Sequence, residues 1–409
     1  MSSKGVPLRS ASPETSGKGV RAPLRGVRFC VTLFTASIKM ERVPRRIKRQ
    51  APDSMRRTEM ICERIELYKE NEYDYPMAFG FRPFFMAYLH EDDEIHPAVL
   101  IIPGGGYEFV SSREGEIVAK RFFSKGYNTF VLVYTIDLMN LAPLKMQALG
   151  DAGRAIRLLR SGAERFGIDP EKIAVLGFSA GGHLAASLAV HHKDAPEKDP
   201  DLAALSARPD VSVLCYPVIS TTDTHNGTIK ALLGINREEA LLEGKMEETP
   251  AGPYPMPGCV TVSDELHYAS LETQVTEDVP PTFLWHTATD ASVPVSNSYR
   301  YAEALKKHGI RHSLHIFSRG KHGLSLANEE WADYRNSPDY TYEQCREITQ
   351  AAVRGDLGVD EETVRLLQEN DHFGSGIRTR DDVPVFEVTV WPEMVHAFIA
   401  DVLGFAERI

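Results

Sequence analysis

The stretch from residue 173 to residue 183 constrains the fold and chemistry of this chain more than any other. An apolar run ends in the pentapeptide GFSAG at 177–181, and a segment of small, helix-forming residues follows it. This G-x-S-x-G pattern predicts a strand, a sharp turn and a helix, with Ser179 standing clear of the backbone. Such a turn crowds the chain two residues either side of the serine, where only glycine lacks a clashing Cβ. A Gly-Ser turn without chemical function is the alternative, and the flanking strand and helix favour a nucleophilic serine.

Two residues further along the chain complete a candidate catalytic set with Ser179. Asp290 and His322 each follow directly after an expected strand, at 282–286 and 312–317. Because parallel strands end at the same edge of a sheet, all three side chains are expected to project from that edge. The order nucleophile, acid, base is that of the α/β-hydrolase triad. A turn-forming aspartate and a packed or surface histidine are the alternatives, and the position of both residues in this series favours catalysis.

A glycine-rich loop precedes these residues. The apolar run 97–102 leads straight into PGGGY at 103–107, where three glycines allow the backbone to turn its N–H groups inward. In a serine hydrolase such a loop supplies half of the oxyanion hole, so we assign the N–H groups of Gly105 and Ala180 to it. A flexible turn or a phosphate-binding loop is the alternative, although G-x-G-x-x-G and a P-loop lysine are both absent. The residues expected to contact substrate are Gly104, Gly106, Tyr107 and Val293.

Strand and helix patterns alternate along the body of the chain. Short apolar runs predict strands, and amphipathic stretches between them predict helices. The expected strands are 63–69, 84–89, 97–102, 129–134, the run ending at 178, 211–216, 282–286 and 312–317. The expected helices are 111–125, opened by a capping box at 111–114, then 144–166, the helix after Ser179, 296–309, 342–354, 360–369 and 392–405. This alternation predicts an α/β fold with a mostly parallel central sheet covered by helices on both faces. The chain order of the candidate triad makes the expected fold one of the α/β-hydrolase type.

Charge and composition divide the chain into a tail and a body. Residues 1–60 hold 14 Lys and Arg against 4 Asp and Glu, and we expect a basic, disordered N-terminal extension there. The body, 61–409, is expected to be the catalytic domain, with cap or insert segments at about 219–280 and 328–386. The body is strongly acidic, which argues against a nucleic-acid partner. Shaping the substrate pocket and covering the surface remain alternative roles for the inserts.

Composition also bears on cellular context. No apolar run reaches about 18 residues, so no membrane span is expected. The five cysteines are odd in number and show no C-x-x-C spacing, which favours thiols in a reducing compartment and a cytoplasmic location. The apolar stretch 29–38 has basic flanks, so a secretion signal, or a translation start at a later methionine, is the alternative. No spacing typical of metal ligands occurs, and neither a metal nor a cofactor is expected.

Several of these motifs together resemble a known family. The sequence resembles the acetyl-xylan-esterase-like branch of the α/β-hydrolase esterase/lipase superfamily at five motifs. They are PGGGY at 103–107, GIDPEKI at 167–173, GFSAGGH at 177–183, PPTFLWHTA at 280–288 and KHG at 321–323. The resemblance covers residues 60–327 and the last helix. It implies hydrolysis of short acyl esters, acetyl groups on plant-derived sugars above all, by Ser179, Asp290 and His322 without a cofactor. A peptidase or amidase with the same triad, and a non-catalytic binding protein of this fold, are the alternatives.

Overall fold

The computed structural model describes residues 60–236, 254–333, 339–369 and 382–405. All of these residues belong to one compact unit of the chain. The basic extension expected at 1–60 therefore lies outside the described residues, apart from Met60, which begins the first strand. The disorder expected of that extension stays a prediction.

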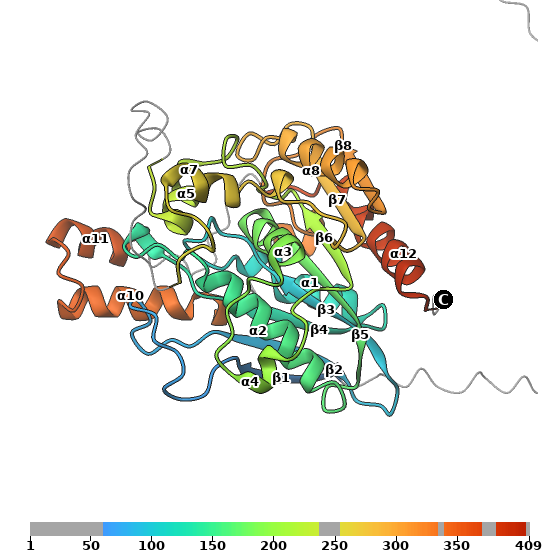
Figure 1. Ribbon diagram of the computed structural model, residues 1–409, viewed down its shortest axis with the longest axis horizontal. Helices are drawn as coiled ribbons and strands as arrows, with labels where there is room; N and C mark the ends of the chain where they lie inside the picture. Colours follow the sequence, from blue (N-terminus) through green and yellow to red (C-terminus); the bar gives the residue numbers. More distant parts are fainter. Residues whose placement is uncertain (1–59, 237–253, 334–338, 370–381, 406–409) are drawn as a thin grey trace, which may run out of the picture. The chain divides into compact units, whose positions relative to one another are not determined.

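Eight strands form one sheet in the described part of the chain, in the order β1-β2-β4-β3-β5-β6-β7-β8 (Figure 1). Their bounds are β1 Met60–Glu66, β2 Phe84–His90, β3 His96–Ile102, β4 Asn128–Val133, β5 Ile168–Phe178, β6 Val211–Cys215, β7 Thr282–Thr287 and β8 His312–Phe317. β2 runs antiparallel to both of its neighbours, and all other neighbouring pairs are parallel. The mostly parallel sheet is confirmed, and each strand expected from the sequence is present.

Helices cover both faces of the sheet, as expected. The first face carries α2 (Gln147–Ser161), α3 (Ser179–His191) and α8 (Ser296–Lys307), and the second carries α1 (Glu116–Phe123) and α12 (Trp391–Leu403). Figure 1 looks onto the first face, with α2 and α3 in front of the strands. Alternate residues of β3 join the apolar clusters on opposite faces, which is why its sequence is continuously apolar. Shorter elements are α4 (Pro200–Ala203) and single 3-10 turns at Leu138–Asn140, Leu271–Thr273, Tyr340–Tyr342 and Val388–Val390.

The first helix after the glycine loop starts later than the sequence predicts. Residues Ser112–Glu114 form a turn of 3-10 helix, Ser111 makes no side-chain capping bond, and α1 begins only at Glu116. The predicted capping box is therefore wrong. The physical reason is that the Glu114 carboxylate turns toward the glycine loop and accepts a hydrogen bond from the Gly104 N–H instead.

The insert at 219–280 lies against the loop that joins β4 to α2. Its described helices are α5 (Asn226–Leu233) and α7 (Val262–Tyr268). A weak helical pattern at 229–233 predicts the first of these helices, and the sequence does not predict the second. A further helical pattern at 238–242 lies outside the described residues. Lys145, in the β4–α2 loop, forms a fully buried ion pair with Glu265 of α7, with 2.6 Å between Nζ and Oε2. This contact fixes α7 to the domain.

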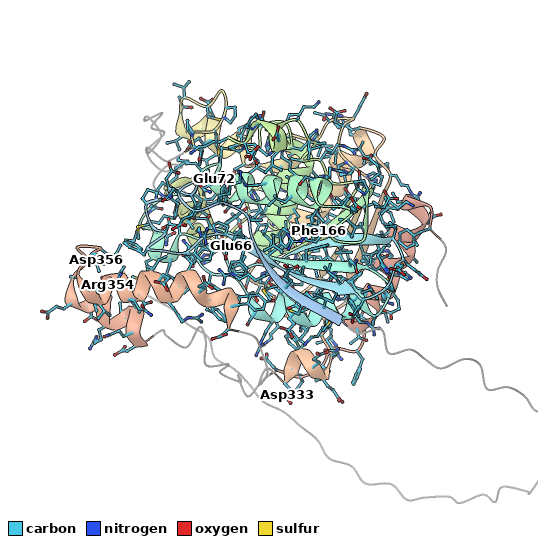
Figure 2. The ribbon with its side chains drawn as sticks, turned by 90° about the horizontal axis from the view of Figure 1, so that it is seen from below. Glu66, Glu72, Phe166, Asp333, Arg354 and Asp356 are labelled. Atoms are coloured by element: carbon cyan, nitrogen blue, oxygen red, sulfur yellow. The ribbon has the colours of Figure 1, made fainter. Side chains whose placement is uncertain are left out.

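The insert at 328–386 also packs on the body of the domain. Its described helices are α9 (Glu329–Ala332), α10 (Glu343–Arg354) and α11 (Glu361–Glu369). The side chain of Gln344 on α10 accepts from the Ile136 N–H at 2.9 Å and donates to the Ile136 carbonyl at 3.1 Å. Figure 1 shows α10 and α11 side by side, and in Figure 2 Arg354 and Asp356 mark their outer end. One end of the insert thus docks on the core while the other projects from it.

In the part of the chain that the structure describes, no helix is long and apolar enough to cross a bilayer. The cysteines within these ranges, Cys62, Cys215, Cys259 and Cys345, form no disulfide. Within the described ranges, no group of three or more His, Cys, Asp or Glu side chains could hold a metal ion.

Candidate active site

Ser179 occupies the sharp turn that the G-x-S-x-G pattern predicts. It follows β5 as the first residue of α3, and its backbone φ is 52°, in the left-handed region. A non-glycine residue in this conformation costs about 1–3 kcal/mol, so the surrounding structure must enforce it. The two glycines make the turn possible. A Cβ on Gly177 would lie 2.2 Å from the carbonyl oxygen of Gly181, and one on Gly181 would lie 2.2 Å from that of Ile102.

The structure brings Ser179, His322 and Asp290 into one chain of hydrogen bonds. The Ser179 hydroxyl lies 2.7 Å from Nε2 of His322, and Nδ1 of His322 lies 2.6 Å from Oδ2 of Asp290. The three residues follow the carboxyl ends of β5, β7 and β8, as expected from the sequence. Ser179 and Asp290 are each 9 % exposed, so little water competes for these hydrogen bonds. An imidazole placed between a carboxylate and a serine hydroxyl can accept the serine proton.

The surroundings of Asp290 keep its carboxyl ionised. Burial alone would raise its pKa, but hydrogen bonds from His286, His322 and the Val293 N–H outweigh burial and hold the pKa well below its usual range. Oδ1 accepts from the N–H groups of Ser292 and Val293, both at 2.9 Å. His286 approaches Oδ2 at 3.4 Å and donates to the Val293 carbonyl at 3.0 Å. Because the carboxylate is ionised, Nδ1 of His322 carries the proton and Nε2 is left to accept.

The glycine loop lies directly against Ser179. A Cβ on Gly104 would lie 2.8 Å from the Ser179 Cβ and 2.7 Å from the Phe178 carbonyl oxygen, so only glycine allows this approach. The Gly104 N–H donates a hydrogen bond to the Glu114 carboxylate. No hydrogen bond among the described residues uses the N–H of Gly105 or of Ala180. Ala180 is the second residue of α3, where N–H groups have no partner within the helix. The glycine loop and the start of α3 therefore each hold one backbone N–H that makes no hydrogen bond with the described residues.

A buried glutamate anchors the glycine loop. The Glu114 residue is 3 % exposed, its Oε2 accepts the Gly104 N–H at 2.8 Å, and its Oε1 accepts the Tyr216 hydroxyl at 2.7 Å. The Tyr216 ring meets the His322 imidazole edge-on, with 5.0 Å between centroids, and its hydroxyl accepts the Ser325 N–H at 3.0 Å. Burial raises the pKa of the Glu114 carboxyl, and the hydrogen bonds from Tyr216 and Gly104 offset part of that rise. Glu114 thus connects the glycine loop, through Tyr216, to the loop after β8 that carries His322, here called the histidine loop.

Two residues expected to contact substrate have buried side chains. Tyr107 is 1 % exposed, and its hydroxyl donates to Nδ1 of His183 at 2.8 Å. Burial lowers the pKa of His183 to about 4, and its Nε2 donates to the Ala269 carbonyl at 2.9 Å. Val293 is also buried, and its backbone holds Asp290. A contact between substrate and Tyr107 or Val293 stays a prediction, and burial of both side chains restricts it to their backbones.

One family model covers the centre of the chain. Residues 87–305, more than half of the sequence, match the model described as BD-FAE. The chain belongs to the BD-FAE family. The resemblance to the α/β-hydrolase superfamily drawn from the motifs is therefore confirmed. The match includes the glycine loop, Ser179 and Asp290 but ends before His322, which the structure places beside Ser179.

Relatives of this BD-FAE member carry named activities. The chain is 41 % identical over 282 residues to endo-1,4-beta-xylanase B of Butyrivibrio fibrisolvens, which covers 69 % of this chain and 41 % of that protein. It is 26 % identical over 243 residues to the acetylxylan esterase of Xylanibacter ruminicola, covering 58 % and 43 %. The crystal structure of an acetyl ester-xyloside bifunctional hydrolase from Caldicellulosiruptor lactoaceticus matches at 37 % identity and a TM-score of 0.53, over 73 % of this chain and 97 % of that one. The chain spans about two fifths of the length of the two curated relatives.

Three residues of the site were not predicted as such from the sequence of this BD-FAE member. Tyr216 follows β6 at the same edge of the sheet as Asp290, so its position could have marked it. His286 lies inside β7, and the sequence predicts a packed or surface histidine there, without a catalytic role. The structure confirms that packing and adds the contact with Asp290. No local pattern pairs Glu114 with a backbone N–H ten residues earlier, which is why it was missed.

Proposed function

We propose that this BD-FAE member is a serine esterase that hydrolyses short-chain acyl esters, acetyl esters above all, on xylan-derived or other oligosaccharides. The observation that carries the proposal is the unbroken hydrogen-bonded chain from the Ser179 hydroxyl through His322 to the Asp290 carboxylate. Relatives named acetylxylan esterase and acetyl ester-xyloside bifunctional hydrolase support an acetylated substrate. Ser179 is the proposed nucleophile, His322 the base and Asp290 the acid that orients it.

In the first half-reaction, Oγ of Ser179 attacks the carbonyl carbon of the ester. Nε2 of His322 accepts the hydroxyl proton as the new C–O bond forms, and the carbonyl π electrons move to the carbonyl oxygen. The ionised Asp290 stabilises the imidazolium that results. When the tetrahedral intermediate collapses, the bond to the alcohol oxygen breaks and His322 returns the proton to that oxygen. The acyl group is then esterified to Ser179.

The N–H groups of Gly105 and Ala180 are the proposed oxyanion donors in both half-reactions. The N-terminal end of α3 adds a favourable partial positive charge at the same place. Losing one such donor typically costs about 3 kcal/mol of transition-state stabilisation. In the second half-reaction His322 takes a proton from water, water oxygen attacks the acyl carbon, and Oγ of Ser179 leaves with that proton. Acetate and the free enzyme are the products for an acetyl ester.

Polar side chains beside the glycine loop support a carbohydrate alcohol. A Cβ on Gly106 would lie 3.7 Å from Oγ1 of Thr228 and 3.8 Å from Oε2 of Glu108, so both side chains border that end of the loop. Oε1 of Glu108 accepts from the Asn140 side-chain amide at 3.0 Å. A carboxylate, an amide and a hydroxyl group can exchange hydrogen bonds with sugar hydroxyls, whereas a long lipid chain offers them no hydrogen-bond partner.

The proposal extends to the organisation and location of the protein. We assign the activity to residues 61–409 and regard the basic segment 1–60 as an extension of this catalytic domain. A cytoplasmic location is supported by the lack of a disulfide among the four described cysteines, with secretion as the alternative. The proposed partner is a small ester or acetylated oligosaccharide, and no nucleic acid or membrane partner is proposed.

Comparison of the wild type with Ser179→Ala tests the proposal. We expect the wild type to hydrolyse p-nitrophenyl acetate faster than longer esters and to release acetate from acetylated xylo-oligosaccharides, and Ser179→Ala to lose several orders of magnitude in rate. The matched control is Ser187→Ala, two turns further along α3, where the hydroxyl lies 3.4 Å from Nδ1 of His183. Ester cleavage without acetate release from the sugar would discard the substrate. A rate unchanged in Ser179→Ala would discard the triad.

A further inference from the structure

Residues of the insert at 328–386 hold both chain neighbours of His322. Lys321 precedes His322 and Gly323 follows it, in a segment after β8 that has no regular secondary structure. Asp382 contacts the side chain of Lys321, and Trp331 contacts the backbone of Gly323. The sequence does not indicate these contacts, because no local pattern pairs Trp331 with a carbonyl eight residues earlier, and Asp382 lies 61 residues after Lys321.

Asp382 lies between two cations. Its side chain is fully buried, Oδ2 accepts from Nη1 of Arg113 at 2.6 Å, and Oδ1 accepts from Nζ of Lys321. Arg113 directly precedes Glu114, which anchors the glycine loop. Lys321 directly precedes His322. One buried carboxylate therefore connects the segment that anchors the glycine loop to the segment that carries the imidazole.

Trp331 reinforces the same connection from α9. Its Nε1 donates to the Gly323 carbonyl at 3.0 Å, and the residue is 1 % exposed. The guanidinium carbon of Arg113 lies 5.6 Å from the Trp331 ring centroid, and Nζ of Lys321 lies 5.7 Å from it. Both distances are within the range of cation–π attraction. The two cations are thus held by a carboxylate and an aromatic ring that both belong to the insert.

We propose that Asp382 and Trp331 are positioning residues, which fix the histidine loop so that Nε2 of His322 stays within hydrogen-bond distance of Ser179. This inference rests on the proposed serine esterase function. It gives the insert a role in the rate of the reaction rather than in the recognition of substrate. Neither residue contacts Ser179, His322 or Asp290 directly in the hydrogen bonds that form the proposed relay.

Charge explains why Asp382 has this effect. Removing its charge leaves Arg113 and Lys321 without their shared partner, and the two cations then repel each other. The Lys321 side chain is 52 % exposed, so it can move outward to water and shift the next residue, His322. A displacement of about 1 Å in a catalytic group can cost about 100-fold in rate. The glycine loop that would bind the ester is still held by Glu114, so substrate affinity should hardly change.

Asp382→Asn tests the inference. We expect kcat for p-nitrophenyl acetate to fall by about 10- to 100-fold with KM within about twofold of the wild type. Asp382→Glu keeps the charge and should recover part of the lost kcat. The matched control is Asp356→Asn, which has the same charge change in the same insert but breaks an exposed ion pair with Arg354, 2.9 Å long, at the outer end of α10 (Figure 2). Its kcat and KM should equal those of the wild type.

Trp331→Phe provides a second variant if Asp382→Asn does not fold. It keeps an aromatic ring next to both cations but removes the donor to Gly323, and we expect a kcat about tenfold lower. The rate at which an organophosphonate labels Ser179 should fall in the same proportion, because that step uses the same base. Wild-type kcat in folded Asp382→Asn or Trp331→Phe, or a raised KM with unchanged kcat, would overturn the inference. A wild type without serine-dependent ester cleavage would instead overturn the proposed function.

Discussion

The N–H of Gly104 donates a 2.8 Å hydrogen bond to the Glu114 carboxylate, ten residues further along the chain. This contact occupies the Gly104 donor, whereas the next N–H, that of Gly105, makes no hydrogen bond among the described residues and is the proposed oxyanion donor. The second oxygen of Glu114 accepts the Tyr216 hydroxyl, and Tyr216 packs on the imidazole of His322. A single buried carboxylate thus fixes the geometry of one proposed oxyanion donor and one side of the proposed base.

Glu114→Gln tests this role of the carboxylate. A glutamine has only one accepting oxygen, so its NH₂ group must replace the acceptor of either the Gly104 N–H or the Tyr216 O–H, and that donor loses its partner. A buried donor left unpaired costs about 1–3 kcal/mol, and we expect lower thermal stability together with a 10- to 100-fold loss in kcat/KM. Ester hydrolysis and thermal unfolding of the same preparation measure both effects.

Two further variants sharpen the Glu114 test. Glu116→Gln carries the same charge change two residues away, where the side chain contacts Lys120 and Tyr88, and its kcat/KM should stay within about twofold of the wild type. Tyr216→Phe removes one donor to Glu114 and keeps the Gly104 contact, so its loss should be smaller than that of Glu114→Gln. Equal activity in Glu114→Gln and Glu116→Gln would show that the glycine loop holds its shape without Glu114.

Asp290→Asn is expected to lower kcat by roughly 10³- to 10⁴-fold with little loss of fold, because an amide cannot fix the imidazole in the required tautomer. Two other aspartates give matched comparisons. Asp278 is exposed and pairs with Lys193, and Asp264 caps the start of α7. Their asparagine variants should keep wild-type kcat in the same p-nitrophenyl acetate assay. A greater loss in either of them than in Asp290→Asn would identify a different acid.

Gly177 and Gly181, on either side of the sharp turn at Ser179, should tolerate substitution by alanine far less than glycines in open turns. A Cβ at Gly181 would lie 2.2 Å from the Ile102 carbonyl oxygen and 2.3 Å from that of Pro103, and both are backbone atoms that cannot move independently. Gly181→Ala should therefore lose more than about 3 kcal/mol of unfolding free energy. Gly126→Ala meets nothing within 4 Å and strains only its φ of 88°, so about 1–2 kcal/mol is expected. Chemical denaturation measures the unfolding free energy of both variants, and similar losses would contradict this account of the turn at Ser179.

The sequence predicts those parts of the site that depend on a short motif or on the end of a strand. Ser179 lies in a five-residue motif, and Asp290 and His322 each follow an apolar strand, so the sheet alone brings them to one edge. Glu114 shows where local pattern fails. Its spacing from Ser111 suggests a capping box, but in the folded chain the carboxylate pairs with a buried backbone donor of the glycine loop instead.

The other parts of the site could not be predicted from the sequence because they depend on contacts between segments that are far apart along the chain. Asp382 is separated from Lys321 by 61 residues and from Arg113 by 269, and nothing in the intervening sequence specifies that these three side chains meet. The strands, by contrast, could be predicted because each faces a core on one or both sides and shows this in its own apolar pattern. The insert helix α7 was missed since its position depends on a buried pair, Lys145 with Glu265, that is formed only in the folded chain.

Buried Asp137 provides a prediction about pH. Burial, with a smaller contribution from Glu108, raises the pKa of Asp137 to about 7, although the N–H groups of Leu141 and Ala142 both donate to its Oδ1. In the unfolded chain the pKa is about 3.9. Between these values the folded state binds more protons than the unfolded state, so this group lowers the stability as pH rises from about 4 to about 7. Above pH 7 the whole penalty is present, and below pH 4 it is absent.

Asp137→Asn should therefore stabilise the protein at pH 8 by about 1–3 kcal/mol relative to the wild type and have little effect at pH 4.5. The asparagine keeps an oxygen for both N–H groups and replaces Oδ2, which is buried with no hydrogen-bond partner among the described residues. Asp151 is the matched contrast, since burial raises its pKa to about 6 but donors from Thr135, Tyr68 and Gln147 fill both of its oxygens. Asp151→Asn places an NH₂ group against some of those donors and should destabilise the fold at both pH values. Urea unfolding of the three proteins at pH 4.5 and pH 8 measures these differences, and a pH-independent change in Asp137→Asn would show that this carboxyl does not titrate with folding.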